Sequence, residues 1–173
     1  MGYLRPIAIA TTLAIGLCAA GPASAGSNSM AGGSVQFSTP DTWLEILQTD
    51  GDPETLVFQV PDPSPTGQVV LARISVTVKQ EPDIAGFQAY VSQANAKAAA
   101  LPGYQAAGKG ADPNAYSYTA REAGVPAVYR ELYWYKDGHA IQLRCLRPQQ
   151  SKAGAGWISA FDKGCEALAA QLK

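Results

Sequence analysis

The spacing of the apolar residues changes along this chain of 173 residues, and that change constrains the fold more than any single motif does. Residues 69–79 alternate between apolar and polar side chains, which predicts a strand with one buried face. Asp83 then stands where it can cap a helix, and Pro102-Gly103 can end one. Between them, helical spacing places five apolar residues on one stripe: Phe87, Val91, Ala94, Ala98 and Leu101. A strand followed by a helix is therefore predicted.

Short strands are predicted on both sides of that helix. The extended patterns before it cover residues 35–37, 43–47 and 55–60, and those after it cover residues 104–107, 115–121, 125–136 and 139–146. Asp137-Gly138 is a two-residue turn signal that joins the last two strands into a hairpin. A second helix is predicted over residues 157–172. Because hairpin connections imply antiparallel pairing, the predicted fold class is α+β, an antiparallel sheet flanked by helices.

The first 25 residues have the three parts of an export signal. Arg5 supplies a basic start, residues 7–20 are almost entirely apolar, and Ala23-Ser24-Ala25 is a small-x-small cleavage site. Leu17 is larger than the residue that normally precedes a lipoprotein cysteine, which disfavours lipidation of Cys18, and no twin arginine is present. We therefore predict a Sec-type signal over residues 1–25, cut after Ala25, and a periplasmic or secreted protein.

The rest of the chain is predicted to form one domain. Residues 26–34 are rich in glycine and serine and are expected to be a flexible leader, with a single α+β domain over residues 35–173. No later segment is long and apolar enough to span a membrane. With 13 basic and 14 acidic residues the chain lacks the basic field that nucleic acids or anionic membranes attract, so neither is an expected partner.

Two cysteines remain after the predicted cleavage, Cys145 and Cys165. An even pair in an exported chain favours a disulfide, which would close a loop of about 20 residues. Two free thiols or a metal-binding pair are the alternatives. The pair lacks the close spacing of zinc ligands, and the only histidine, His139, lies outside the loop. The sequence therefore predicts a disulfide, with no metal and no cofactor.

A row of tyrosines is the candidate binding surface. Alternation places Tyr129, Tyr133 and Tyr135 on one face of the predicted strand at residues 128–136, together with Glu131. Tyr116 and Tyr118 on the preceding strand can extend that row. Such a surface could stack a sugar or hold a protein partner. The alternative is that a helix covers these rings, as expected for a sheet packed on both faces.

No catalytic residues are predicted. His139 follows the Asp137-Gly138 turn, and the chain has no Gly-x-Ser-x-Gly motif to supply a nucleophile. The acidic residues at positions 50, 52 and 54 resemble the start of a calcium loop, but the glycine and the distal glutamate of an EF-hand are missing. An ordinary polar turn is the preferred interpretation.

Several segments together resemble the PsbP-like superfamily. Four features over residues 35–172 carry the resemblance. They are the opening Val35-x-Phe37-x-x-Pro40-x-x-Trp43, the Leu101-Pro102-Gly103-Tyr104 end of the central helix, the antiparallel hairpin and the closing helix. That superfamily includes the PsbP subunit of photosystem II and exported bacterial proteins of the DcrB-like and LpqN-like types. The resemblance implies an α-β-α sandwich with a non-enzymatic binding or assembly role. It supplies no catalytic motif to transfer.

The sequence therefore predicts an exported, non-catalytic binding protein of the cell envelope. A protein partner is preferred, in an accessory or immunity-type role. A small-ligand or glycan-binding module that uses the tyrosine face is the first alternative. A hydrolase that uses carboxylates alone is the second, because any two acidic residues can converge in space.

Overall fold

The structure, a computed structural model, describes residues 25–108 and 112–173. The strands before the first helix are β1 (Ala25–Met30), β2 (Val35–Pro40), β3 (Leu44–Thr49), β4 (Glu54–Gln59) and β5 (Arg73–Gln80). Helix α1 (Ile84–Ala99) is followed by β6 (Gln105–Ala106), β7 (Ala115–Glu122), β8 (Val125–Lys136) and β9 (His139–Pro148), and α2 (Ala155–Leu172) closes the chain. Two short 3-10 helices, at Ala31–Gly33 and Pro65–Gln68, lie in the connections.

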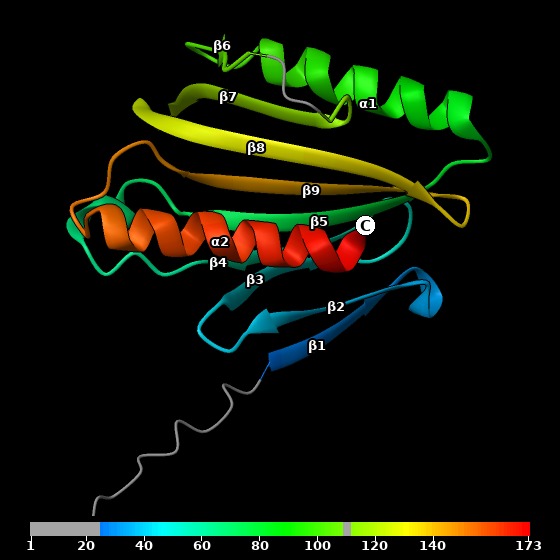
Figure 1. Cartoon of the computed structure of the whole chain (residues 1–173), viewed down its shortest axis with the longest axis horizontal. Helices are drawn as coiled ribbons and strands as arrows, with labels where there is room; N and C mark the ends of the chain where they lie inside the picture. Colours follow the sequence, from blue (N-terminus) through cyan, green and yellow to red (C-terminus); the bar gives the residue numbers. More distant parts are fainter. Residues whose placement is uncertain (1–24, 109–111) are drawn as a thin grey trace, which may run out of the picture.

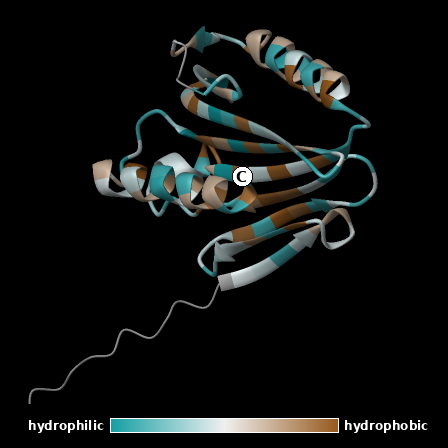
Figure 2. Ribbon diagram, turned by 45° about the vertical axis from the view of Figure 1, so that its right-hand side comes forward, coloured by the Kyte–Doolittle hydropathy of each residue, from teal (hydrophilic) through white to brown (hydrophobic). Residues whose placement is uncertain are grey.

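Seven strands form one antiparallel sheet in the order β3-β4-β5-β9-β8-β7-β6, and β1 and β2 form a separate hairpin (Figure 1). The helices lie on opposite sides of the large sheet, and hydrophobic residues gather on the strands between them (Figure 2). The antiparallel α+β fold predicted from the spacing of apolar residues is confirmed. Each face of the sheet has its own apolar core.

The larger core lies between the sheet and α2, with the β1-β2 hairpin at its border. Alternation along β4, β5 and β9 delivers buried side chains to this face, among them Phe58, Ile74, Val76 and Leu143. Phe161 and Leu168 of α2 pack against them. A disulfide joins Cys145 of β9 to Cys165 of α2, as predicted, and so links the helix covalently to the middle of the sheet.

The smaller cores lie beneath α1 on the other face. Phe87, Val91 and Ala98 are buried residues of the predicted apolar stripe, and the Asp83 carboxylate accepts a hydrogen bond from the Gly86 N–H at 2.8 Å, which confirms the predicted cap. Strand β5 begins four residues later than predicted. The N–H groups of Val69 and Val70 both donate to the Thr66 carbonyl at 3.1 Å, so a turn uses the donors that a longer strand would need.

The flexible leader predicted over residues 26–34 is wrong. Residues 25–30 form β1, which pairs with β2 from Ala25↔Pro40 to Met30↔Val35. Met30 is 1% exposed, and the Glu54 carboxylate accepts a hydrogen bond from the Ala31 N–H at 2.6 Å. Backbone pairing stabilises this strand despite its polar side chains, which is why composition missed it. The predicted signal peptide lies, apart from its last residue, outside the described residues.

None of the helices in the described part of the chain has the length and apolar character to cross a membrane.

Replacing Cys165 with serine is expected to lower the free energy of unfolding by about 2 to 5 kcal/mol, because the disulfide restricts the unfolded chain. Denaturant titration measures the change. The exported protein should also have an intact mass two hydrogens below the reduced value. Labelling of a thiol in the folded exported protein without substitutions would contradict the disulfide. An unchanged denaturation midpoint of Cys165→Ser would contradict the expected loss of stability.

Two glycines of α2 provide a matched test of packing. A methyl group at Gly164 would lie 2.8 Å from the Trp43 ring, whereas a methyl group at Gly156 would meet nothing within 4 Å. Gly164→Ala should therefore destabilise the protein by about 1 to 2 kcal/mol, because overpacking outweighs the gain in helix propensity. Gly156→Ala should be neutral or stabilising by about 0.5 kcal/mol. Equal effects of the two substitutions in thermal denaturation would count against close packing of Trp43 on α2.

Candidate functional site

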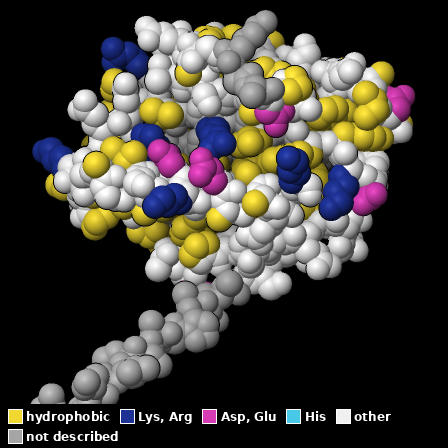
Figure 3. Space-filling model, in the orientation of Figure 1, with side chains coloured by type: hydrophobic (Ala, Val, Ile, Leu, Met, Phe, Trp, Pro, Cys, Tyr) yellow, Lys and Arg dark blue, Asp and Glu magenta, His cyan; other side chains and the backbone are white. Residues whose placement is uncertain are grey.

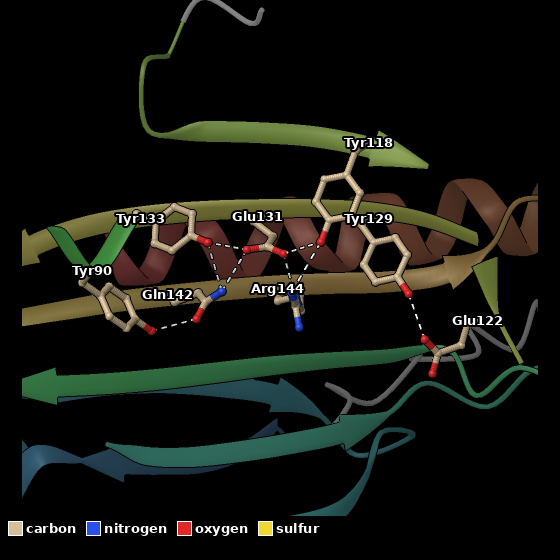
Figure 4. Close-up of polar contacts among 8 residues, drawn as sticks. All are labelled: Tyr90, Tyr118, Glu122, Tyr129, Glu131, Tyr133, Gln142 and Arg144. Carbon is tan, nitrogen blue, oxygen red and sulfur yellow. Dashed lines mark hydrogen bonds and ion pairs between the residues drawn. The ribbon is translucent and has the colours of Figure 1, made fainter. Parts of the chain in front are cut away.

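A carboxylate without solvent exposure lies at the centre of the sheet. Glu131 of β8 faces α1, and its side chain is 0% exposed. We call Glu131 and the four side chains that donate hydrogen bonds to it the Glu131 cluster; the donors are Tyr118, Tyr133, Gln142 and Arg144 (Figure 4). Each carboxylate oxygen accepts two of these bonds, so the buried charge is fully hydrogen-bonded.

Strand register brings the donors together. Glu131 pairs with Arg144 across β8 and β9, and Tyr133 pairs with Gln142. The Arg144 Nε lies 2.7 Å from one oxygen of Glu131, and the Gln142 amide nitrogen lies 2.9 Å from the other. Tyr118 reaches across from β7, with its hydroxyl 2.5 Å from Glu131. Side chains from three neighbouring strands therefore converge on one carboxylate.

Burial and the neighbouring Glu131 raise the pKa values of the tyrosines around this carboxylate. Burial is the main cause that raises the pKa of Tyr118 and Tyr133 well above the usual range, and Glu131 raises both further. The pKa of Tyr90, whose hydroxyl donates to Gln142 at 2.7 Å, is raised to about 12 by burial and then by Glu131. Burial lowers the pKa of Arg144, but Glu131 and Tyr118 together more than offset this, so the net shift is upward. The tyrosines act as donors and the arginine as a permanent cation.

A second ion pair extends this network toward β5. Tyr129 stacks on Tyr118 with ring centroids 4.7 Å apart, and its hydroxyl donates to Glu122 at 2.8 Å. Arg73 pairs with the same carboxylate at 2.9 Å. Burial raises the pKa of Glu122, but the hydrogen bonds from Arg73 and Tyr129, together with the positive charges of Arg73 and Arg144, lower it more, so the net shift is downward.

Most of the predicted tyrosine surface is buried. Tyr118, Tyr129 and Tyr133 are each at most 2% exposed, beneath α1 and the segment that follows it. Tyr116 and Tyr135 are half-buried, the first packed edge-on against Tyr133 and the second against Phe87. The three buried rings leave no face on which a sugar could stack, so only Tyr116 and Tyr135 of the predicted surface remain partly accessible. The helix covers the buried rings because the side of α1 that faces the sheet is apolar.

A cleft of about 400 Å³ opens beside the Glu131 cluster, between α1 and the half of the sheet that α1 leaves uncovered. We call it the α1 cleft; Tyr90, Gln93 and Lys97 line it from the helix, and Lys79, Gln142 and Arg144 line it from the sheet. Arg144 is a charged member of the Glu131 cluster that reaches solvent here, with 37% of its side chain exposed. The cluster can therefore present a fixed guanidinium group to a ligand.

A larger cavity, of about 630 Å³, lies beside α2. Its two arginines are each matched with a carboxylate of α2: Arg130 with Glu166 at 3.1 Å, and Arg147 with Asp162 at 2.8 Å. Figure 3 views this side of the molecule, where basic and acidic side chains lie next to one another. The cavity therefore has no unmatched arginine for a charged ligand.

His139 lines a third cavity together with Asp52 and Glu54. Both carboxylates accept backbone hydrogen bonds, Asp52 from Gln80 at 2.9 Å and Glu54 from Ala31 at 2.6 Å. Within the described residues, no group of three histidine, cysteine or acidic side chains is arranged to hold a metal ion. The carboxylates of the turn therefore hold the β1-β2 connection and the end of β5 in place.

Sequence reasoning missed Gln142 and Arg144. A signal for them existed, because the Asp137-Gly138 turn sets the hairpin register, starting from Lys136↔His139. Counting back along both strands from that turn places Arg144 opposite Glu131. The predicted tyrosines drew attention to the correct face of β8 but not to its polar partners on β9.

Glu131→Gln is expected to destabilise the protein by about 2 to 4 kcal/mol, because Arg144 loses its ionic partner and the new amide group faces the Gln142 amide at a position without solvent. Glu166→Gln is the matched control. Glu166 is also paired with an arginine, but 63% of its side chain is exposed, so the cost should stay below about 1 kcal/mol. Urea denaturation compares the two, and a similar loss for both would contradict a special role for burial.

No protein-family model matches this chain, and no curated protein matches its sequence. Among solved structures, LpqN of Mycobacterium tuberculosis, which is involved in cell envelope biogenesis, is similar with a TM-score of 0.50 and 14% identity, over 88% of this chain and 85% of LpqN. A protein of unknown function from Pseudomonas aeruginosa has a TM-score of 0.49 and 15% identity, over 83% of this chain and 94% of its own. PsbP of Synechocystis sp. PCC 6803 has a TM-score of 0.47 and 11% identity, over 91% of this chain and 96% of its own. This chain shares the fold of LpqN, which confirms the PsbP-like architecture inferred from the order of its elements.

Proposed function

We propose that this chain is an exported, non-catalytic protein of the cell envelope that binds a partner protein along the free edge of β3. The partner contributes an extended segment that pairs with β3 through backbone hydrogen bonds. The exposed apolar side chains of β3 carry this proposal.

Every residue of β3 is exposed, and its outer edge pairs with no other strand of the described chain. Leu44, Ile46 and Leu47 are 52%, 45% and 50% exposed. A long apolar edge is a site for pairing with another chain, and proteins usually protect such edges. The opposite edge of the sheet is β6, which has only two residues. A bulge between Glu45 and Leu47 is the only irregularity in the pairing of β3 with β4.

The charge around β3 indicates what kind of segment would bind. Residues 26–72 contain no lysine or arginine, whereas their acidic residues are Asp41, Glu45, Asp50, Asp52, Glu54 and Asp62. Glu45 lies within β3, and Asp50 follows directly after the strand. A segment that combines apolar and basic residues would therefore complement this edge.

Other features support an envelope role without catalysis. The first 25 residues have the pattern of an export signal, and a disulfide suits an oxidising compartment. Glu131 is enclosed by its own donors, which leaves its carboxylate no access to a substrate. LpqN, which has the same fold, is involved in cell envelope biogenesis.

The test places a photo-crosslinking residue at Gln48 of β3 in the native envelope, with the same residue at Ser159 on the exposed side of α2 as the control. We expect one protein to crosslink from Gln48 and not from Ser159. With that protein purified, Leu47→Lys should weaken binding at least about tenfold, because it adds a charge to an apolar contact. Val69→Lys, at an equally exposed apolar residue away from the edge, should not.

Hydrogen exchange then tests the mode of binding. The partner should slow exchange of the outward-facing amides of β3, because new backbone hydrogen bonds protect them. Crosslinking from both positions alike, or unchanged affinity of Leu47→Lys, would overturn the proposal.

A further inference from the structure

The α1 cleft carries more positive charge than its surroundings balance. Three cations line it, Lys79, Lys97 and Arg144, and no carboxylate does. The carboxylates that offset two of them lie behind the lining: Glu131 is paired with Arg144, and Glu81 with Lys79. Within the described residues, Lys97 takes part in no ion pair. The cleft therefore keeps one net positive charge at a concave surface, where an anion would be attracted.

The guanidinium group of Arg144 is held in one orientation. Its Nε donates to Glu131 at 2.7 Å, and its Nη2 lies 3.4 Å from the Tyr118 hydroxyl. Both contacts come from the side of β7 and β8, while 37% of the Arg144 side chain is exposed and the residue lines the cleft. A guanidinium group fixed in this way loses little conformational freedom when it binds a carboxylate or a phosphate.

The free energy needed to bury Glu131 also indicates that the Glu131 cluster does more than stabilise the fold. A buried ion pair is often no more stabilising than apolar residues of the same size, so stability alone does not explain a fully buried glutamate. Its structural effect here is to hold Arg144 and Gln142, two of the side chains that line the α1 cleft.

We infer that the α1 cleft binds a small organic oxyanion, one that carries a phosphate or a carboxylate group. Arg144 and Lys97 bind the charged group, and the amide group of Gln93 is placed to hydrogen-bond with it. The ring of Tyr90 offers an apolar surface to the rest of the molecule. A volume of about 400 Å³ suits a small metabolite. This site does not depend on the proposed partner of β3.

Calorimetric titration of the purified mature protein tests the inference, with phenyl phosphate, benzoate and inorganic phosphate as anionic probes and phenol as the neutral one. At least one of the anions should bind with 1:1 stoichiometry, and phenol should not. Phenyl phosphate binding more tightly than benzoate would assign the site to phosphates, and the reverse order to carboxylates. Added salt should weaken binding, because part of the attraction is electrostatic.

Lys97→Gln is the decisive variant, because Lys97 is exposed and its replacement should leave the fold intact. Affinity for the preferred anion should fall about tenfold, as expected for loss of a charge-assisted hydrogen bond. Lys163→Gln, at an exposed lysine on α2, is the control and should bind like the original protein. Arg144→Lys keeps the charge but loses the planar group, and it should also bind more weakly.

Three results would overturn the inference: no binding of any anion at millimolar concentration, equal affinities of Lys97→Gln and Lys163→Gln, or binding to phosphatidylglycerol vesicles without binding to any soluble probe. The last result would indicate a membrane-surface contact rather than a cleft for small molecules.

Discussion

The pairing of β8 with β9 is the interaction on which the rest of the structure depends. Ten residue pairs, from Ala127↔Pro148 to Lys136↔His139, join the two strands at the centre of the sheet. Side chains on one face of this hairpin form the core beneath α1, and those on the other face help to form the core beneath α2. The disulfide at Cys145 fixes α2 to the same hairpin. The helices on both faces of the sheet therefore pack against the same pair of strands.

The helices cover different parts of the sheet, and the candidate sites follow from this. Helix α1 packs over β8 and β9, whereas α2 packs against β2 and β9 on the opposite face. The α1-facing side of β3, β4 and β5 is consequently left without a helix. The α1 cleft forms at the border between the covered and uncovered parts, and the free edge of β3 lies at the far side of the uncovered part. A helix that covered the rest of this face would have filled the α1 cleft, whereas the edge of β3 is free because no other described strand pairs with it.

Most of the fold could be predicted because its signals are local. Alternation in β5 and the apolar stripe of α1 are properties of short segments, and the Asp137-Gly138 turn is read from two residues. The β1 strand was missed because backbone pairing with β2 stabilises it, and that pairing leaves no pattern in a glycine- and serine-rich segment. The tyrosines were assigned to the correct face, but whether a helix covered that face depended on the path of the chain after Gln80.

The sequence by itself determined the fold class, the disulfide and the set of residues on each face of β8, because these depend on periodicity and on the pairing of two cysteines. Only the tertiary structure decided that the tyrosines are buried, that Arg144 is anchored by Glu131 and open to a cleft, and that β3 keeps a free edge. These properties depend on which elements cover which parts of the sheet. Such contacts join residues far apart in the chain, and local patterns carry no record of them.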